Sequence, residues 1–389
     1  MNARNTLIPH VAEDVLPGHP DRLADAVAEH FVEDSIIRDP RALVGVEVAV
    51  FRNTVLVTGR IASGPQLHSE TLFHEIKAYH AFHQAGYLGR WALTAQGWAG
   101  PKAAPDSRCK LEVLSNLELG PLTDEESAIR GFSDDQNIVV GHASGSEETG
   151  WLPPAVFAAR RLREALGSMR ETFKEVCGPD GKVLVRILAE SGTYRLDILN
   201  VSLQHAPEIG YEALHRILLP ALEAEVKALD LALPGIGGSW NPDRFRLNGG
   251  GDFTCGGPRG DNGLSGKKLV VDHYGPGVPI GGGALCGKDP HKVDRAGALR
   301  ARELAVRIVR DTDAKEATVR LGFLPGMREP AFLEAQVDGV WNDSEGIARL
   351  VAVPDLSIEG TVLDLGISRS RWSKVVRAGY FGRGLKWEE

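Results

Sequence analysis

The chain has few cysteines, four in 389 residues, and no two of them form a C-x-x-C pair. Neither a disulfide framework nor a zinc site is indicated, because both need cysteines at short, regular spacings. No apolar run approaches the ~18 residues of a membrane helix, and the N-terminal residues lack the apolar core of a secretory signal. We therefore expect reduced cysteines and a cytoplasmic protein that does not enter a membrane.

An excess of positive charge is also absent. The 44 Lys and Arg residues face 52 Asp and Glu residues, a net charge of −8, so we expect neither nucleic acid nor an anionic membrane as a partner. The content of 43% hydrophobic and 25% charged residues is typical of a globular protein with two or three domains. We predict three, over residues 1–122, 123–246 and 247–389, with a polar loop or linker at 119–133 across the first boundary.

Helical and strand patterns alternate along the chain. Valine occupies every second position of 44–50, and a second run, "TVLVTGRI", follows Arg52-Asn53, which predicts a hairpin with Glu47 off the valine face. Apolar spacing predicts further elements, namely helices at 19–37, 153–166, 208–231 and 294–311, and strands at 135–143, 182–187 and 267–274. Because hairpins recur among the alternating elements, the pattern favours an α+β or mixed α/β fold over a doubly wound sheet.

Glycine is abundant, with 45 residues in the chain against a usual share of ~7%, and it concentrates between 235 and 287. "GGPRGDNGLSGKK" at 256–268 combines glycines, which allow close approach of the backbone, with two lysines. Downstream, Gly282, Gly287 and Lys288 fit G-x-x-x-x-G-K, but Asp289 stands where a phosphate-binding loop needs Ser or Thr. No G-x-G-x-x-G joins a strand to a helix, so a dinucleotide fold has no support. Two interpretations stay open, a phosphate site or turns with solvated lysines.

Two predicted helices begin with residues suited to an anion and a metal. His19 and Asp21 open the first, and Lys292 and Asp294 open a later one. Unpaired N–H groups and the helix dipole favour an anion at such a start, and carboxylates there can bind Mg²⁺ beside a phosphate. Ordinary helix capping explains each pair taken alone.

Together these segments resemble the S-adenosylmethionine synthetase (methionine adenosyltransferase) family. The resemblance rests on "GHPDRLAD" at 18–25, "DQNIVVGHA" at 135–143, "PDGK" at 179–182, the two glycine-lysine blocks at 256–275 and 281–295, and "GYFGR" at 379–383. It implies three similar domains about a pseudo-threefold axis, and a homodimer, or a pair of dimers, with active sites between subunits. It also implies that methionine sulfur attacks C5′ of ATP, with Mg²⁺, two ions per site, and K⁺ as cofactors. The displaced tripolyphosphate is then hydrolysed to pyrophosphate and phosphate.

The resemblance also implies roles for individual residues. The catalytic set is His19, Lys182, Lys268, Lys288 and Lys292. The ATP and phosphate positions are His19, Asp135, Asp180, Lys182, Phe253, Asp261, Lys267, Lys268, Ala284 and Lys288, with Phe253 packing on adenine. Asp261, Lys292 and Arg60 fall at positions near the methionine, Asp21 and Asp294 at Mg²⁺ ligands, and Glu47 at a K⁺ ligand.

Four departures from the family pattern concern the substrates. Lys267 stands in place of an arginine, which changes a bidentate fork to a point charge, and Asp252 replaces another arginine. Arg60 stands where the family has a glutamate that contacts methionine, and no glutamine occurs near Leu119. Three hypotheses follow: synthesis of S-adenosylmethionine, adenosyl transfer to another thioether or methionine analogue, and a non-catalytic nucleotide-binding regulatory partner.

Overall fold

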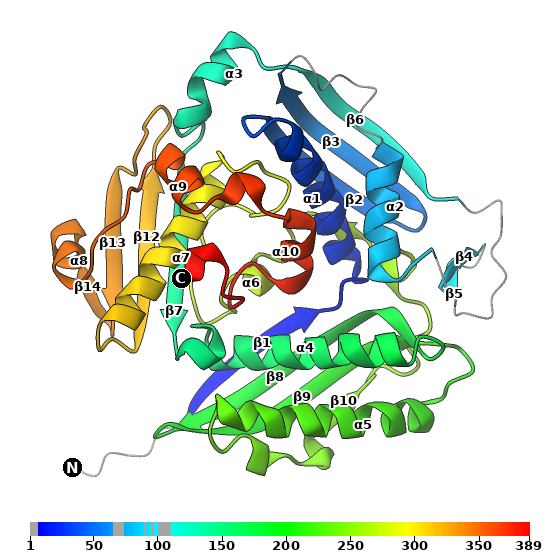
Figure 1. Cartoon of the computed structure of the whole chain (residues 1–389). Coiled ribbons are helices and arrows are strands. Elements are labelled where there is room, and N and C mark those ends of the chain that lie inside the picture. Colours follow the sequence, from blue (N-terminus) through cyan, green and yellow to red (C-terminus); the bar gives the residue numbers. More distant parts are fainter. Residues whose placement is uncertain (1–6, 65–73, 89–90, 95–96, 100–109) are drawn as a thin grey trace.

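The computed structural model describes residues 7–64, 74–88, 91–94, 97–99 and 110–389. In this part of the chain, three four-stranded sheets surround a centre that holds the C-terminal helices (Figure 1). The fold is therefore mixed α+β, as the pattern of elements predicted. Cys177, Cys255 and Cys286 are free thiols, whereas Cys109 and part of the segment 86–110 lie outside the described residues. No helix in the described ranges is long and apolar enough to cross a membrane.

The first sheet has the order β1-β8-β9-β10, and the second has the order β11-β2-β3-β6. The strands of the first are β1 Ile8–Val15, β8 Cys177–Glu190, β9 Thr193–His205 and β10 Phe245–Leu247. Those of the second are β11 Gly263–Leu264, β2 Leu43–Phe51, β3 Thr54–Ser63 and β6 Glu112–Pro121. A separate small pair consists of β4 Ala92–Thr94 and β5 Gly97–Ala99.

The third sheet has the order β14-β13-β12-β7, from β14 Val340–Asn342, β13 Phe332–Val337, β12 Glu316–Phe323 and β7 Asn137–Ser144. Each of the three sheets includes a strand from a distant part of the sequence: β1 pairs with β8, β11 with β2, and β7 with β12. The domain ranges 1–122, 123–246 and 247–389 stay a prediction, because the strand pairing crosses both boundaries.

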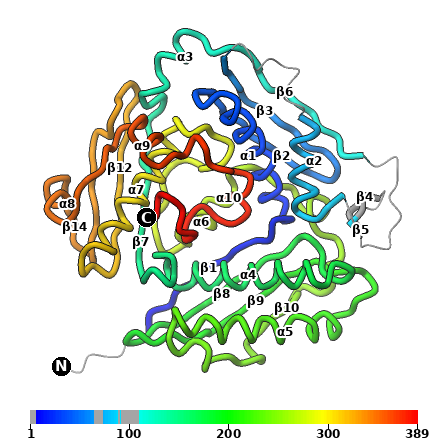
Figure 2. Tube along the Cα trace, in the orientation of Figure 1, coloured from blue at the N-terminus to red at the C-terminus, as the bar shows by residue number. Residues whose placement is uncertain are grey.

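Long helices cover one face of each sheet and bury its apolar side chains. The second sheet packs under α1 Pro20–Arg38 and α2 His74–Ala85, and the first under α4 Pro154–Thr172 and α5 Tyr211–Ala228. The third sheet packs under α7 Val293–Asp311. The helices α9 Ile358–Asp364 and α10 Trp372–Ala378 lie in the centre, between the three sheets with their covering helices (Figure 2). Two short helices, α3 Asp124–Ala128 and α8 Ser344–Leu350, lie at the periphery. On the uncovered faces, strand residues such as Phe51, Leu56, Leu114 and Leu184 are exposed.

Several predicted elements are confirmed. The hairpin at 43–63 forms with Arg52 and Asn53 at its turn, Glu47 is on its exposed face, and the four predicted helices correspond to α1, α4, α5 and α7. The strands predicted at 135–143 and 182–187 correspond to β7 and to part of β8. The helix predicted at 153–166 is longer than expected, because α4 continues to Thr172.

Two predictions of local structure are wrong. Residues 267–274 do not form a strand: they contain the single helical turn α6 Leu269–Asp272. That turn directs Asp272 into the buried interior, where its carboxylate lies 2.6 Å from the Arg22 guanidinium, so a tertiary ion pair overrides the β pattern. Residues 119–133 are not an irregular loop either, because α3 begins there with a capping box between Thr123 and Glu126.

Candidate functional site

The start of α1 is the point where separate sequence blocks meet. Strand β1 leads directly into it and pairs with β8 in a register that sets Val15 opposite Lys182. The Leu16 N–H donates to the Gly181 carbonyl at 2.9 Å, and Gly18 lies so close to Pro179 that a Cβ would fall 2.3 Å from its carbonyl oxygen. The blocks at 18–25 and 179–182 therefore contact each other directly.

His19 caps α1 and is a neutral hydrogen-bond donor. Its Nδ1 accepts a hydrogen bond from the Asp21 N–H at 3.2 Å, and the residue is only 2% exposed. Burial, together with the charges of Lys268 and Lys182, lowers its pKa to about 3. The ring is thus uncharged at neutral pH, and since Nδ1 is an acceptor, its proton lies on Nε2. His19 can donate this proton to an oxygen that gains negative charge.

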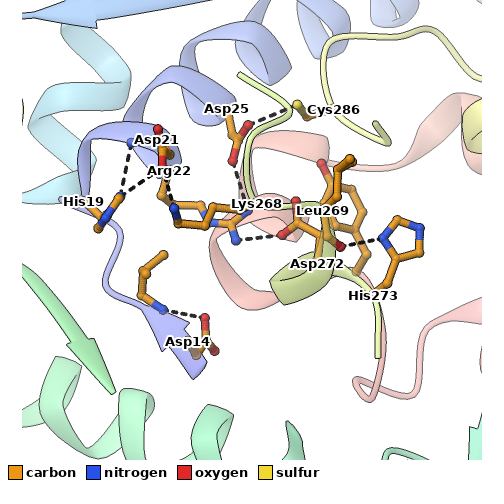
Figure 3. Close-up of polar contacts among 12 residues, drawn as sticks. Asp14, His19, Asp21, Arg22, Asp25, Lys268, Leu269, Asp272, His273 and Cys286 are labelled. Atoms are coloured by element: carbon orange, nitrogen blue, oxygen red, sulfur yellow. Dashed lines mark hydrogen bonds and ion pairs between the residues drawn. The ribbon is translucent and has the colours of Figure 1, made fainter. Parts of the chain in front are cut away.

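Asp21 and Lys268 form an ion pair beside His19 (Figure 3). The Lys268 Nζ lies 2.5 Å from Asp21 Oδ2, and the Leu264 N–H donates to Oδ1 at 3.1 Å, so α1 holds the loop that carries both lysines. Lys267 is nearly half exposed, and its Nζ lies 3.8 Å from Asp21 Oδ1. Hydrogen bonds from Lys268 and Leu264 keep the pKa of Asp21 below its usual value although burial opposes them.

Asp180 and Lys182 lie next to this pair on β8. The Asp180 carboxylate is buried and accepts the Gly257 N–H at 2.8 Å, and among the described residues its Oδ1 has no hydrogen-bond partner. Burial raises the pKa of Asp180 to about 6. Lys182 is exposed, and its charge acts on both Asp180 and His19. The half-buried Phe253 reaches the same region, since a Cβ on Gly256 would lie 3.0 Å from its ring.

A second group of polar side chains forms at the start of α7. The Lys288 Nζ lies 2.9 Å from Asp294 Oδ1, which also accepts a hydrogen bond from the Asn137 amide at 2.8 Å. Gly283 packs against this carboxylate, because a Cβ there would lie 1.3 Å from Asp294 Oδ1. The glycine is therefore required for Asp294 to contact both Lys288 and Asn137.

Lys288 of the second group borders a cavity, which the loop that leads to Lys268 also reaches through Ser265 and Gly266. It has a volume of about 620 Å³ and is lined by Glu47, Gly266, Ala284 and Lys288, among others. Gly266 belongs to the loop that ends in Lys268, and a Cβ on it would lie 2.9 Å from the Ala284 side chain. The loops at 263–268 and 282–288 are thus in contact, and the exposed Glu47 carboxylate shares the cavity with Lys288.

Of the predicted site residues, all of which the structure describes, only Glu47, Ala284 and Lys288 line this cavity. Lys292 forms an ion pair with Asp134, whereas Asp135 is exposed and accepts the Gln136 N–H at 2.7 Å. Asp261 is exposed and lines a different cavity of about 780 Å³ beside the hairpin turn at Arg52. Asp252 is also exposed, and its Oδ1 lies 3.9 Å from His205 Nε2.

Arg60 binds carboxylates of its own chain. Its Nε lies 2.5 Å and its Nη2 3.0 Å from the two Glu126 oxygens, and its Nη1 lies 3.0 Å from Glu118. The bidentate hydrogen bond from Arg60 lowers the pKa of Glu126 to about 2. Arg60 therefore links β3 to α3 through Glu126, and the carboxylates of Glu126 and Glu118 balance its positive charge.

Residue patterns did not single out Asn137 or Asp134, which contact Asp294 and Lys292, or the structural role of Asp289. Asn137 and Asp134 could have been predicted, because they lie in or directly beside the block "DQNIVVGHA". Asp289, in the Ser/Thr position of the G-x-x-x-x-G-K pattern, is fully buried, accepts the Val44 N–H at 2.8 Å and pairs with Arg130. Asp289 therefore links β2 to Arg130 and does not line the cavity.

The arrangement suits a polyphosphate with magnesium. Mg²⁺ in phosphate sites takes one or two carboxylates and fills its remaining positions with phosphate and water. The residues that the structure describes contain no cluster of three or more His, Cys, Asp or Glu side chains that could hold a metal alone. Asp21 and Asp294, each beside a lysine, fit the phosphate-assisted kind of site.

Two family models match most of the chain. "S-adenosylmethionine synthetase, N-terminal domain" matches residues 8–88, and "S-adenosylmethionine synthetase, C-terminal domain" matches residues 255–389. An S-adenosylmethionine synthase of Staphylococcus epidermidis is 30% identical over 97% of this chain and 94% of its own length. The corresponding protein of Wolinella succinogenes is 28% identical over the same shares. An "unusual S-adenosylmethionine synthetase" from Campylobacter jejuni, of solved structure, superposes with a TM-score of 0.83 at 24% identity, over 98% of this chain and 97% of that one.

Proposed function

Because this chain belongs to the S-adenosylmethionine synthetase family, we propose that it forms S-adenosylmethionine from methionine and ATP and hydrolyses the tripolyphosphate product to pyrophosphate and phosphate. One observation carries the proposal. Lysines and carboxylates from blocks far apart in the sequence pair at the starts of α1 and α7, on two loops that contact each other, as an anion with several charges requires.

The leaving group sets the main demand on these residues. The methionine sulfur donates an electron pair to C5′ of ATP, the C5′–O5′ bond breaks, and its electrons remain on the tripolyphosphate oxygen. Lys268, Lys288 and the exposed Lys182 are the groups that stabilise this growing charge, and His19 donates its Nε2 proton to the departing oxygen as a hydrogen bond. Each such donor typically lowers the barrier by ~3 kcal/mol.

Mg²⁺ and K⁺ belong to the proposal. Asp21 and Asp294 would hold Mg²⁺ together with the phosphates, and Glu47 would contribute to a K⁺ site at the cavity that it lines with Lys288. When bound, these cations add positive charge next to the phosphoryl oxygens.

We place the adenine against Phe253, beside Asp180. Asp261 and Lys292 would bind the methionine. Because these two residues lie at separate places in one chain, the proposal includes a homodimer in which a second subunit completes the site. Exposed apolar residues on the uncovered sheet faces, among them Phe51 and Leu184, support such pairing.

Methionine is favoured over a thioether with an additional acid group. The second possibility depends on a free positive charge at Arg60, but this guanidinium is paired with Glu126 and Glu118. A panel of thioethers, with adenosylated products detected by mass spectrometry, decides between them: we expect turnover of methionine, and preferred turnover of an acidic analogue would reverse the choice.

Product analysis tests the reaction itself. Purified protein with ATP, methionine, Mg²⁺ and K⁺ should yield S-adenosylmethionine, pyrophosphate and phosphate in equal amounts, and no phosphate without methionine. Calorimetric binding of ATP with no product at all would instead identify a nucleotide-binding partner that has lost turnover, the interpretation that Asp252 and Arg60 motivate.

A further inference from the structure

Helix α1 places a second carboxylate, Asp25, one turn after Asp21. The side chain of Asp25 is fully buried, and its Oδ1 accepts a hydrogen bond from the Cys286 thiol at 3.1 Å (Figure 3). The same oxygen accepts a second hydrogen bond from the Gly266 N–H at 2.8 Å. Asp21, four residues earlier on the helix, accepts a hydrogen bond from the Leu264 N–H. The two carboxylates therefore bind the N–H groups of Leu264 and Gly266, which lie two residues apart in the same loop.

The two donors to Asp25 come from different loops. Gly266 precedes Lys268 by two residues, and Cys286 precedes Lys288 by two residues. Gly266 has a φ of +75° and Gly287, next to Cys286, also has a φ of +75°, so both loops turn sharply at the point of attachment. Asp25 Oδ1 therefore forms hydrogen bonds to both the loop that carries Lys268 and the loop that carries Lys288.

Arg22 keeps this carboxylate in place. Its Nη1 lies 3.2 Å from Asp25 Oδ2, and its Nη2 lies 2.6 Å from Asp272, all with buried side chains. Burial raises the pKa of Asp25 to about 7, an effect that the Arg22 charge opposes. With donors directed at both of its oxygens, Asp25 acts as an acceptor that belongs to neither loop.

We propose that Asp25 is a positioning residue, which sets the spacing between Lys268 and Lys288 by holding both loops through one carboxylate oxygen. The inference rests on the proposed function, in which these two lysines bind one tripolyphosphate. Asp25 itself is fully buried and does not line the cavity beside Lys288. Its effect is that both ammonium groups are already in place when the anion binds, so that binding does not have to order two separate glycine-rich loops.

The Cys286 side of this contact allows a test without unfolding the protein. Asp25→Ala would leave the buried Arg22 charge short of a partner, and its effect on folding would hide any effect on binding. Cys286→Ala removes only the thiol donor and keeps the Gly266 bond. Cys286→Ser restores a hydroxyl donor, and Cys177→Ala is the matched control, because Cys177 is a buried free cysteine outside the site.

The experiment measures the affinity for inorganic tripolyphosphate with Mg²⁺ by calorimetry, and the KM for ATP and kcat, in full-length protein. We expect Cys286→Ala to weaken tripolyphosphate binding about fivefold, which corresponds to ~1 kcal/mol. Cys286→Ser should return to within about twofold of wild type, and Cys177→Ala should bind as wild type does.

The possible outcomes separate this inference from the proposed function. Absence of tripolyphosphate binding by the wild type would remove the proposed function, and the inference with it. If the wild type binds but Cys286→Ala binds equally well, or if the serine variant binds as weakly as the alanine variant, the positioning role is refuted while the function stands. A lower urea midpoint for Cys286→Ala with unchanged affinity identifies a structural contact only, and likewise refutes it.

Discussion

Replacement of Lys288 by alanine separates catalysis from stability. The Lys288 ammonium lies 2.9 Å from Asp294, and the two side chains are 29% and 16% exposed, so the pair is close to solvent. Pairs of this kind contribute at most ~1 kcal/mol to the free energy of unfolding. In the proposed reaction, the same ammonium would donate to the departing tripolyphosphate and lower the barrier by ~3 kcal/mol, which is roughly a hundredfold in rate.

We therefore expect Lys288→Ala to lose about two orders of magnitude in kcat/KM, while urea unfolding changes by less than ~1 kcal/mol. The assay follows methionine-dependent phosphate release. Lys227→Ala is the matched control, because Lys227 forms an ion pair with Glu223 at 2.7 Å on the surface of α5. Activity of Lys288→Ala within about threefold of the control would refute the reasoning, since that corresponds to less than ~1 kcal/mol. So would a loss of activity explained by unfolding.

Two further substitutions test the geometry and the electrostatics. In Gly283→Ala the new Cβ would lie 1.3 Å from Asp294 Oδ1, so we expect activity to fall about tenfold or more. In Gly277→Ala the new Cβ would have no atom of the described residues within 4 Å, apart from its chain neighbours, so this variant should keep full activity; equal activity of the two variants would contradict the packing. Burial raises the pKa of Asp180 to about 6 from an ordinary value of 3.8, so the folded state binds this proton more tightly and loses stability as the pH rises between these values. Asp180→Asn, which keeps an acceptor for the Gly257 N–H, should remove up to ~3 kcal/mol of that pH dependence in urea unfolding between pH 4 and 7, and identical slopes would contradict the assignment.

The sequence predicted the long elements because their patterns are local. Alternate valines in 44–50 form the buried face of β2, and the apolar spacing at 294–311 corresponds to α7. The turn α6 could not be predicted, since the Arg22–Asp272 ion pair that fixes it joins residues 250 positions apart. The helix α3 could have been, because Thr123 and Glu126 have the spacing of a capping box.

In the candidate site, too, local sequence patterns could be predicted and tertiary contacts could not. Residue types and spacing directed attention to Lys268 and Lys288, but the connection between their loops through Asp25 depends on tertiary contacts. Arg60 stands at a position where the resemblance implied contact with methionine, and its pairing with Glu126 could not be read from either residue alone.

A crystal structure with inorganic tripolyphosphate and Mg²⁺ tests the central claim most directly, because that claim concerns which side chains bind one anion. We predict that the ammonium groups of Lys182, Lys268 and Lys288 contact oxygens of the same tripolyphosphate, with subunit symmetry applied. An anion bound elsewhere, or one that only a single lysine of the three contacts, would contradict the account.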